Sequence, residues 1–266
     1  MHRPYRRPLT ILAAVIALGA TWPAAAADIS VREVADALFR SRAGHPIDLG
    51  GRSLEGLDLA GLDFKGARLS GADLFGTDLT RTRLVGVDLE GARLDRAIVI
   101  RADFTGARLK GAMLRSLTVF STVDPDPADA PRFNGADLTD VHIVARLDGT
   151  DFRGANLTDA RIGQQSGVWG SYSPRMGLIG ADFSAAELRR TNLKSAVLHF
   201  ARFVNATIID SNFRDTDLSG ADFTGAEVQG TDFTGANLDG AIFRGAKGLD
   251  LAIGLAAAVN ADRMVR

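Results

Sequence analysis

The chain has 266 residues, with 31 Lys and Arg, 32 Asp and Glu, and no cysteine. The near-neutral charge excludes both the basic footprint of a typical nucleic-acid-binding protein and the strongly acidic surface of a nucleic-acid mimic. The lack of cysteine excludes disulfides, thiolate nucleophiles and cysteine-ligated metals.

The N-terminal segment, residues 1–26, is predicted to be a cleavable export signal. Three arginines precede an apolar run from 9 to 20, and a small-residue stretch follows at 24–27. This order is typical of a secretory signal, and the apolar run is too short to span a bilayer. We therefore expect an exported protein, periplasmic or extracellular, with no membrane span in its mature form. Sec and twin-arginine export both stay open, and an uncleaved membrane anchor is the alternative.

Residues 27–46 are predicted to form an N-terminal capping helix. Ser30 and Glu33 have the spacing of a capping box. Apolar residues then recur at helical spacing as far as Leu38, so we expect a helix over 30–43. Its apolar face would cover the end of the structure that follows.

From 47 to 246 the chain repeats a five-residue unit: a small residue, then Asp, Asn or Arg, then Leu or Phe, any residue, and Gly. We call the large apolar residue the centre of its unit. A period of five fits neither a helix at 3.6 nor a strand at 2. Short extended pieces joined by tight turns do fit, with each centre pointing to a shared axis. Self-similarity at a fixed period is typical of a solenoid.

Units such as GADLF, GTDLT, GADFT and GANLD are similar to those of the pentapeptide-repeat family, over about three quarters of the chain. The resemblance implies an all-β fold: a right-handed quadrilateral parallel β-helix with four units to a coil and about nine coils. Residues on one side of such a coil should recur every twenty positions. Fourth-side centres, from Phe64 to Phe243, are Phe except at Leu84, and first-side centres are aliphatic from Leu49 to Val228. The pattern predicts a column of Phe rings in a four-sided core.

Outward residues one position before these centres alternate in sign down the first and fourth sides. The first side begins Asp48, Arg68, Asp88, Arg108, and the fourth begins Asp63, Arg83, Asp103, Arg132. Vertical neighbours of opposite charge favour ion pairs between coils. A charged recognition strip is the functional alternative.

Two inserts, 120–132 and 163–177, interrupt the repeat at the two corners that flank the third side. Outward positions of that side, acidic or amide elsewhere, become mostly apolar on the coils around the inserts, with Arg146 and Asp148 among them. An exposed apolar patch beside loops is typical of a binding site. We predict partner contacts at Ile98, Ile100, Phe120, Arg146, Asp148, Trp169, Tyr172 and Ile179. The alternative is that the inserts fold back and bury the patch.

Residues 247–266 are predicted to form a C-terminal helical cap. Leu249, Leu251, Leu255 and Val259 lie there in an alanine-rich segment of high helical propensity. The resemblance implies either a lid on the last coil or a homodimer contact through this helix.

The sequence offers no catalytic constellation. His45, His142 and His199 fall on separate parts of the expected coil, so no histidine pair has ligand spacing. Asp124, Asp126 and Asp129 are spaced like calcium ligands, but prolines lie between them and the glycine of a calcium loop is missing. We therefore predict no enzyme, no metal and no cofactor.

The predicted function is an exported, non-enzymatic scaffold that binds an unknown protein partner through the third side and its inserts. One alternative is a carbohydrate- or small-ligand-binding protein using Trp169, Tyr172, Asp148 and Arg146. Another, implied by the resemblance, is inhibition of DNA gyrase by duplex mimicry. The export signal and the near-neutral charge disfavour it, and we expect no nucleic-acid partner.

Overall fold

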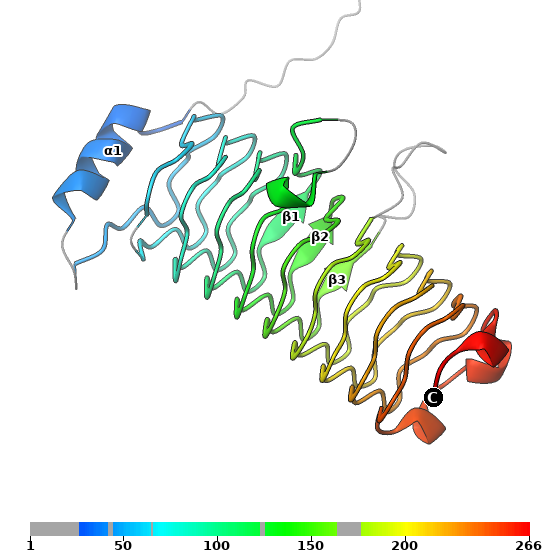
Figure 1. Cartoon of the computed structure of the whole chain (residues 1–266). Helices are drawn as coiled ribbons and strands as arrows, with labels where there is room; N and C mark the ends of the chain where they lie inside the picture. The colour runs from blue at the N-terminus through cyan, green and yellow to red at the C-terminus, as the bar shows by residue number, and fades with distance from the viewer. Residues whose placement is uncertain (1–26, 42–44, 65, 123–125, 164–176) are drawn as a thin grey trace, which may run out of the picture.

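The chain winds into a rod of stacked coils (Figure 1). The computed structural model describes residues 27–41, 45–64, 66–122, 126–163 and 177–266. Helix α1 (Val31–Arg40) lies at the N-terminal end of the rod, and three short 3₁₀ helices lie at the other end. No helix in these described ranges is long and apolar enough to cross a membrane.

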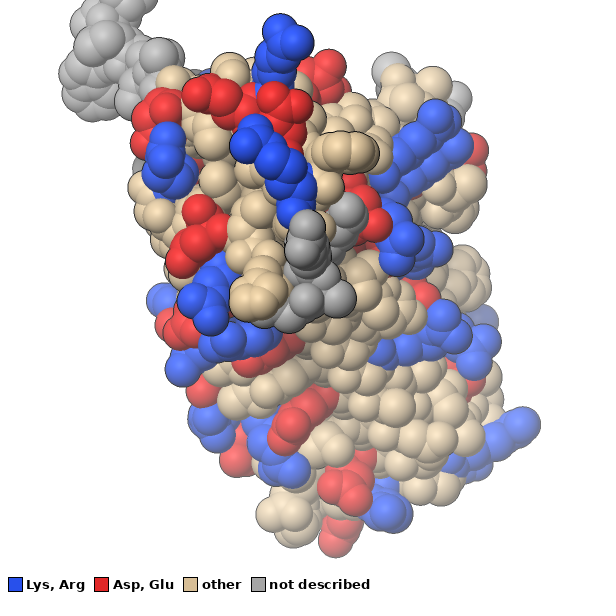
Figure 2. Space-filling view, turned by 90° about the vertical axis from the view of Figure 1, so that its left-hand side faces the viewer, with Lys and Arg blue, Asp and Glu red and all other residues tan. Residues whose placement is uncertain are grey.

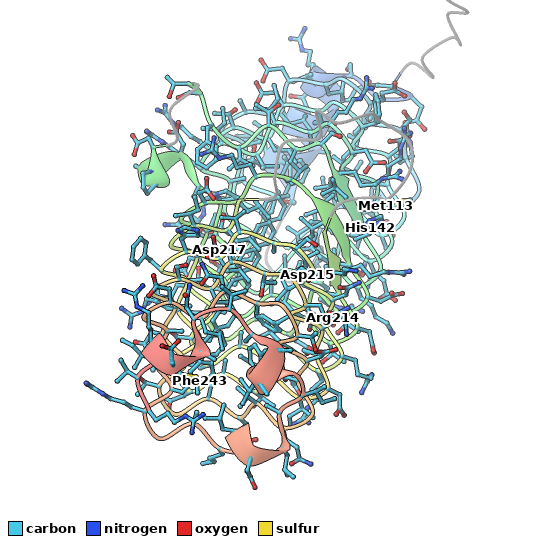
Figure 3. The ribbon with its side chains drawn as sticks, turned by 90° about the vertical axis from the view of Figure 1, so that its right-hand side faces the viewer. Met113, His142, Arg214, Asp215, Asp217 and Phe243 are labelled. Atoms are coloured by element: carbon cyan, nitrogen blue, oxygen red, sulfur yellow. The ribbon has the colours of Figure 1, made fainter. Side chains whose placement is uncertain are left out.

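Each coil pairs in parallel with the next through residues about twenty positions apart. Asp48 pairs with Arg68 and Arg68 with Asp88, and the columns continue on all four sides. Most pairings are single bridges. On the second side they lengthen into the strands β1 (Met113–Arg115), β2 (His142–Val144) and β3 (Arg161–Ile162), paired in that order. The twenty-residue columns expected from the period are confirmed, and neighbours such as Met113 and His142 lie side by side (Figure 3).

The core contains the predicted column of Phe rings. Successive rings stack with centroids 4.6 to 5.3 Å apart and planes within 9° of parallel, in the order Phe104, Phe133, Phe152, Phe183, Phe203, Phe223, Phe243. Phe213 and Phe233 form a second group that meets this column edge-on, with interplanar angles of 73° between Phe213 and Phe203 and 87° between Phe233 and Phe223. The core therefore gains aromatic edge contacts as well as a stack.

The capping box at the N-terminus is present. Ser30 Oγ accepts a hydrogen bond from the N–H of Glu33 at 3.3 Å, and the Glu33 carboxylate accepts one from the N–H of Ser30 at 2.8 Å. Val34 and Leu38 are buried with the core of the coils. The helix ends at Arg40 rather than 43, because the next residue adopts an extended backbone.

The corners of the coil need left-handed backbone, and many of them are not glycine. Seven consecutive corners have positive φ with a side chain: Ala185, Arg190, Ser195, Phe200, Asn205, Asp210 and Asp215. The last four of these side chains fold onto glycines of the next coil, where an added Cβ would overlap them. At these four corners the glycine below leaves room for the side chain above it.

The predicted C-terminal α-helix over 247–266 is wrong. The chain instead forms η2 (Leu249–Leu251), η3 (Leu255–Ala257) and η4 (Ala261–Arg263). Bridges separate these 3₁₀ helices, since Ile253 pairs with Asp232, Val259 with Asn237 and Val265 with Ile242. The segment is therefore one more coil, with a period of six residues instead of five.

The backbone explains this correction. Gly248, Gly254 and Asn260 have φ of 69°, 75° and 56° at six-residue intervals. Left-handed residues cannot continue an α-helix, and bonding to the previous coil satisfies N–H and C=O groups at its edge. The repeated coil therefore extends past 246 to Val265.

Candidate binding surface

The middle of the third side brings together four of the predicted contact residues. Arg146 Nε donates to Asp148 Oδ2 at 2.6 Å, and the Arg146 guanidinium lies 5.9 Å from the centroid of the Phe120 ring. Asp148 Oδ1 also accepts the N–H of Ile179 from the next coil at 2.8 Å. We call Phe120, Arg146, Asp148 and Ile179 the central cluster.

Asp148 is the fixed point of this cluster. Its side chain is almost fully buried, and the ion pair with Arg146 and the hydrogen bond from Ile179 satisfy its carboxylate oxygens. The carboxylate also fills the space where a Cβ at position 177 would lie, which explains the glycine there. Ile98 and Ile100 are half-buried on the same side of one coil, which directly precedes that of Phe120. Trp169 and Tyr172 lie outside the described residues.

The described part of the first insert folds onto the corner between the third and fourth sides. Its 3₁₀ helix η1 (Pro127–Asp129) places the Asp129 C=O to accept the N–H of Arg101 at 2.7 Å, as a coil residue would. The buried Asp129 carboxylate accepts hydrogen bonds from Ser121 and pairs with Arg101 at 2.9 Å, and these contacts lower its pKa. Pro127 lies over Gly149. This insert is anchored at the edge of the third side.

Phe200 is a surface residue that the sequence reasoning missed. The residue is 66% exposed, and its φ of 56° lies in the left-handed region that is unfavourable for phenylalanine. The ring lies on Gly220 of the next coil, where an added Cβ would come within 2.6 Å of it, and it meets the His199 ring edge-on at 6.2 Å. The signal was available, because Phe200 occupies the fifth position of its unit, where glycine closes many others.

A polar network lies below this ring. His199 Nε2 is 2.6 Å from Asp217 Oδ2, while Ser219 Oγ donates to Asp217 Oδ1 at 2.6 Å. Asn237 Nδ2 donates to the Ser219 hydroxyl at 2.8 Å. Burial would raise the pKa of Asp217, but the hydrogen bonds from Ser219 and His199 outweigh it and lower the pKa.

This network is not a catalytic triad. Ser219 and His199 both bond to Asp217 rather than to each other, so the imidazole is not placed to take a proton from the hydroxyl. Within the described ranges no group of three His, Asp or Glu side chains could hold a metal ion.

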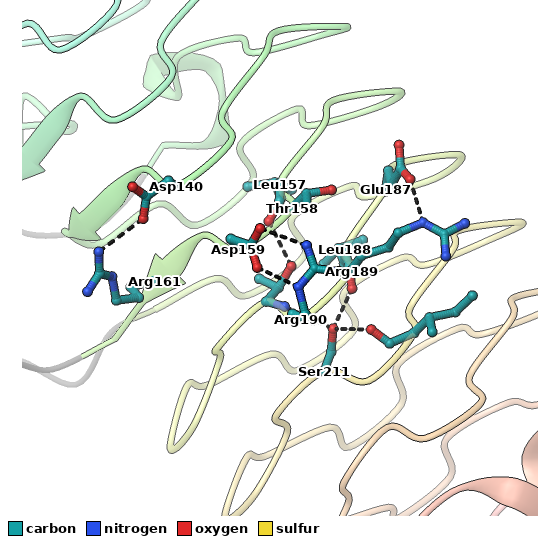
Figure 4. A network of polar contacts seen from close by, with 12 residues as sticks. Asp140, Leu157, Thr158, Asp159, Arg161, Glu187, Leu188, Arg189, Arg190 and Ser211 are labelled. Carbon is teal, nitrogen blue, oxygen red and sulfur yellow. Dashed lines mark hydrogen bonds and ion pairs between the residues drawn. The ribbon is translucent and has the colours of Figure 1, made fainter.

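The charged ladders on the other sides are ion-paired. The pairs predicted between coils include Arg68–Asp48 at 4.0 Å, Arg108–Asp88 at 3.5 Å, Arg83–Asp63 at 3.7 Å and Arg132–Asp103 at 2.7 Å. Two corner residues add further pairs: Asp159 with Arg190, through two contacts of 2.7 Å, and Asp140 with Arg161 of β3 at 3.0 Å (Figure 4). Figure 2 shows acidic and basic side chains mixed over the visible face, without a large area of one sign. Exposed pairs of this kind contribute little to stability.

Comparison with protein families gives a direct match to the repeat. The family model described as pentapeptide repeats matches in 8 copies, over residues 47–81, 82–116, 145–164, 178–215 and 216–247. None of the curated proteins compared with the chain matches it.

Several solved structures are similar. HetL, a pentapeptide repeat protein involved in heterocyst differentiation regulation in a Nostoc cyanobacterium, is 26% identical, with 90% of this chain and 100% of HetL covered and a TM-score of 0.42. QnrB1, a plasmid-mediated fluoroquinolone resistance protein, is 17% identical, with 66% and 89% covered and a TM-score of 0.37. A pentapeptide repeat protein of the Arabidopsis thaliana thylakoid lumen is 24% identical, with 48% and 79% covered and a TM-score of 0.26. At these TM-scores the likenesses do not bear on function.

Proposed function

The chain belongs to the pentapeptide-repeat family, whose members fold as right-handed β-helices, and we propose that it is an exported, non-enzymatic scaffold that binds another protein through its third side. Export is supported by the basic, apolar and small-residue order of residues 1–26.

The observation that carries the proposal is where large apolar side chains are exposed. Among the described residues they lie at the two ends of the rod, at Val85 on the fourth side, at Ile179 on the third side, and at Phe200 on the adjoining corner of the next coil. Ile179 also belongs to the central cluster, where Asp148 bonds its backbone N–H and the Arg146 side chain. Neighbouring apolar side chains on a rigid backbone are typical of protein-binding surfaces.

A charge placed at Ile179 should abolish partner capture. We expect the mature protein to crosslink a partner in an envelope or extracellular fraction of its host, and Ile179→Glu to reduce the captured amount about tenfold or more, because a carboxylate would be desolvated at the contact. The control is Val85→Glu, since Val85 follows its centre as Ile179 does and is 38% exposed against 40%. Equal capture by the two variants would refute binding through the third side.

A second proposal, association of two copies through the C-terminal end, is favoured by a separate observation. The last coil exposes Leu251 by 56%, Ile253 by 54% and Val259 by 52%. It surrounds an open hollow of about 730 Å³ lined mainly by Ala, Gly and Leu. An apolar coil end with an unpaired sheet edge is a surface that a second copy can cover.

The oligomeric state tests this second proposal. Sedimentation should show a dimer for the mature protein and a monomer for the double variant Ile253→Asp, Val259→Asp, whose charges would face each other across the contact. Phe39→Asp is the control, because Phe39 is 87% exposed at the opposite end and should leave the dimer intact. A monomeric wild-type protein at all concentrations would exclude the dimer.

A further inference from the structure

Phe200 occupies a corner position at which phenylalanine is unfavourable for the folding of the coil. Left-handed backbone is unfavourable for a bulky residue, and its neighbours in the corner column above and below are Gly180 and Gly220. The side chain is also left 66% exposed. Other corners without glycine carry Arg, Ser, Ala, Asn or Asp, which leave no large apolar group in water. A strained residue that exposes an aromatic ring indicates a role outside folding.

The ring is also held in place. It rests on Gly220, where the absence of a Cβ makes room for it, and its edge contacts His199. His199 is in turn fixed at 2.6 Å from Asp217. A ring whose rotamer is already fixed loses little entropy on binding, which is the property of an interface anchor.

Carboxylates lie on both sides of the coil that meet at the Phe200 corner. Gly220 lies between Asp217 on the third side and Asp222 on the fourth, and Asp182 lies on the fourth side of the coil above. The cation that faces them is Arg202, which lies between Asp182 and Asp222 in the same column and reaches Asp182 at 3.8 Å. These three carboxylates outnumber the one arginine on the two sides that meet at this corner. An aromatic face bordered by negative charge attracts a guanidinium or ammonium group.

We propose that Ile179, Phe200, Asp217 and Asp222 bind a basic segment of the protein partner, with an Arg or Lys of that segment over the Phe200 ring and an aliphatic side chain on Ile179. The inference rests on the proposed function and adds the chemistry of the partner. The Asp217 carboxylate is already held in position by Ser219 and His199. It can therefore attract the cation of the partner without moving.

The test uses labelled short peptides in which Arg alternates with Leu, with citrulline and Glu versions as probes of charge. Binding to the mature protein is followed by fluorescence anisotropy. The variant is Phe200→Gly, which removes the ring and relieves the left-handed strain, so the fold is retained. The matched control is Asn205→Gly, the next corner of the chain, with φ of 56° and a side chain folded onto Gly225 in the same way.

We expect the Arg peptide to bind wild type and Asn205→Gly alike, to bind Phe200→Gly about tenfold or more weakly, and to weaken as salt increases. The citrulline and Glu peptides should bind less than the Arg peptide. Equal affinity of both glycine variants, or tighter binding of the Glu peptide, would overturn the proposal. So would a lower melting temperature of Phe200→Gly, since the ring would then serve the coil. The peptides could fail to bind while Ile179→Glu still reduces capture of the partner. That result would refute the basic partner and leave the proposed binding through the third side intact.

Discussion

Replacing Phe203 by Ala should lower the free energy of unfolding by about 3–5 kcal/mol. The ring is fully buried and stacks between Phe183 at 5.0 Å and Phe223 at 4.7 Å, with Phe213 edge-on at 5.7 Å. The coils above and below are fixed by backbone pairing, so they cannot move in to fill the cavity. Urea unfolding followed by far-ultraviolet circular dichroism measures the loss.

Val204→Ala is the control for this substitution. Val204 is the next residue in the same unit and is half-exposed, so its truncation should cost far less than that of Phe203. A loss below about 1 kcal/mol for Phe203→Ala would contradict the stacked core. Because solenoid coils contact only their neighbours, a broadened transition would show that the coils on either side of Phe203 unfold separately.

The core could be predicted because one period governs it. Once the twenty-residue spacing is set, Phe183, Phe203 and Phe223 must lie above one another. The first insert did not disturb this prediction, since Phe133 re-enters the column against Phe104 at 4.8 Å. Periodicity carries this information because parallel pairing repeats the same contact at every coil.

The same twenty-residue spacing predicted the residues of the central cluster. Phe120, Arg146, Asp148 and Ile179 fall on the third side of successive coils, and their contacts follow from that placement. The repeat pattern predicts outward side chains only beside each centre, so it did not indicate Phe200. A left-handed corner also projects its side chain, so a large residue in the glycine position is a further sign of a surface site.

The conformation of residues 247–266 could not be predicted from the five-residue period. Ala and Leu have high helical propensity, and summed over residues 247–266 they outweigh two glycines. Helical propensity takes no account of the open edge of the preceding coil. The C-terminal segment forms hydrogen bonds with the backbone groups of that edge. Ile253, for example, donates its N–H to Thr231 and accepts the N–H of Phe233. Pairing at that edge selects the six-residue coil over an isolated helix, which gains no such contacts.

Replacing Gly254 by Ala tests this correction, because the two structures predict opposite signs. In the observed coil Gly254 has φ of 75°, and an added Cβ would lie 2.6 Å from the backbone N and 2.7 Å from the Cα of Thr234. Backbone atoms of a paired coil cannot yield, so we expect a loss of about 3 kcal/mol or more, or local unwinding of residues 249–265. In an α-helix the same change would instead stabilise by about 1 kcal/mol.

Gly240→Ala is the matched control for Gly254→Ala. Gly240 has φ of 66° but nothing within 4 Å of an added Cβ, so it carries only the left-handed strain, about 1–2 kcal/mol. Hydrogen exchange at the amides of Ile253, Val259 and Val265, which donate to the preceding coil, measures the unwinding residue by residue. These amides should lose protection in Gly254→Ala and keep it in Gly240→Ala. Equal protection in both variants would show that the segment does not need the overlap-free corner, and the six-residue coil would then be refuted.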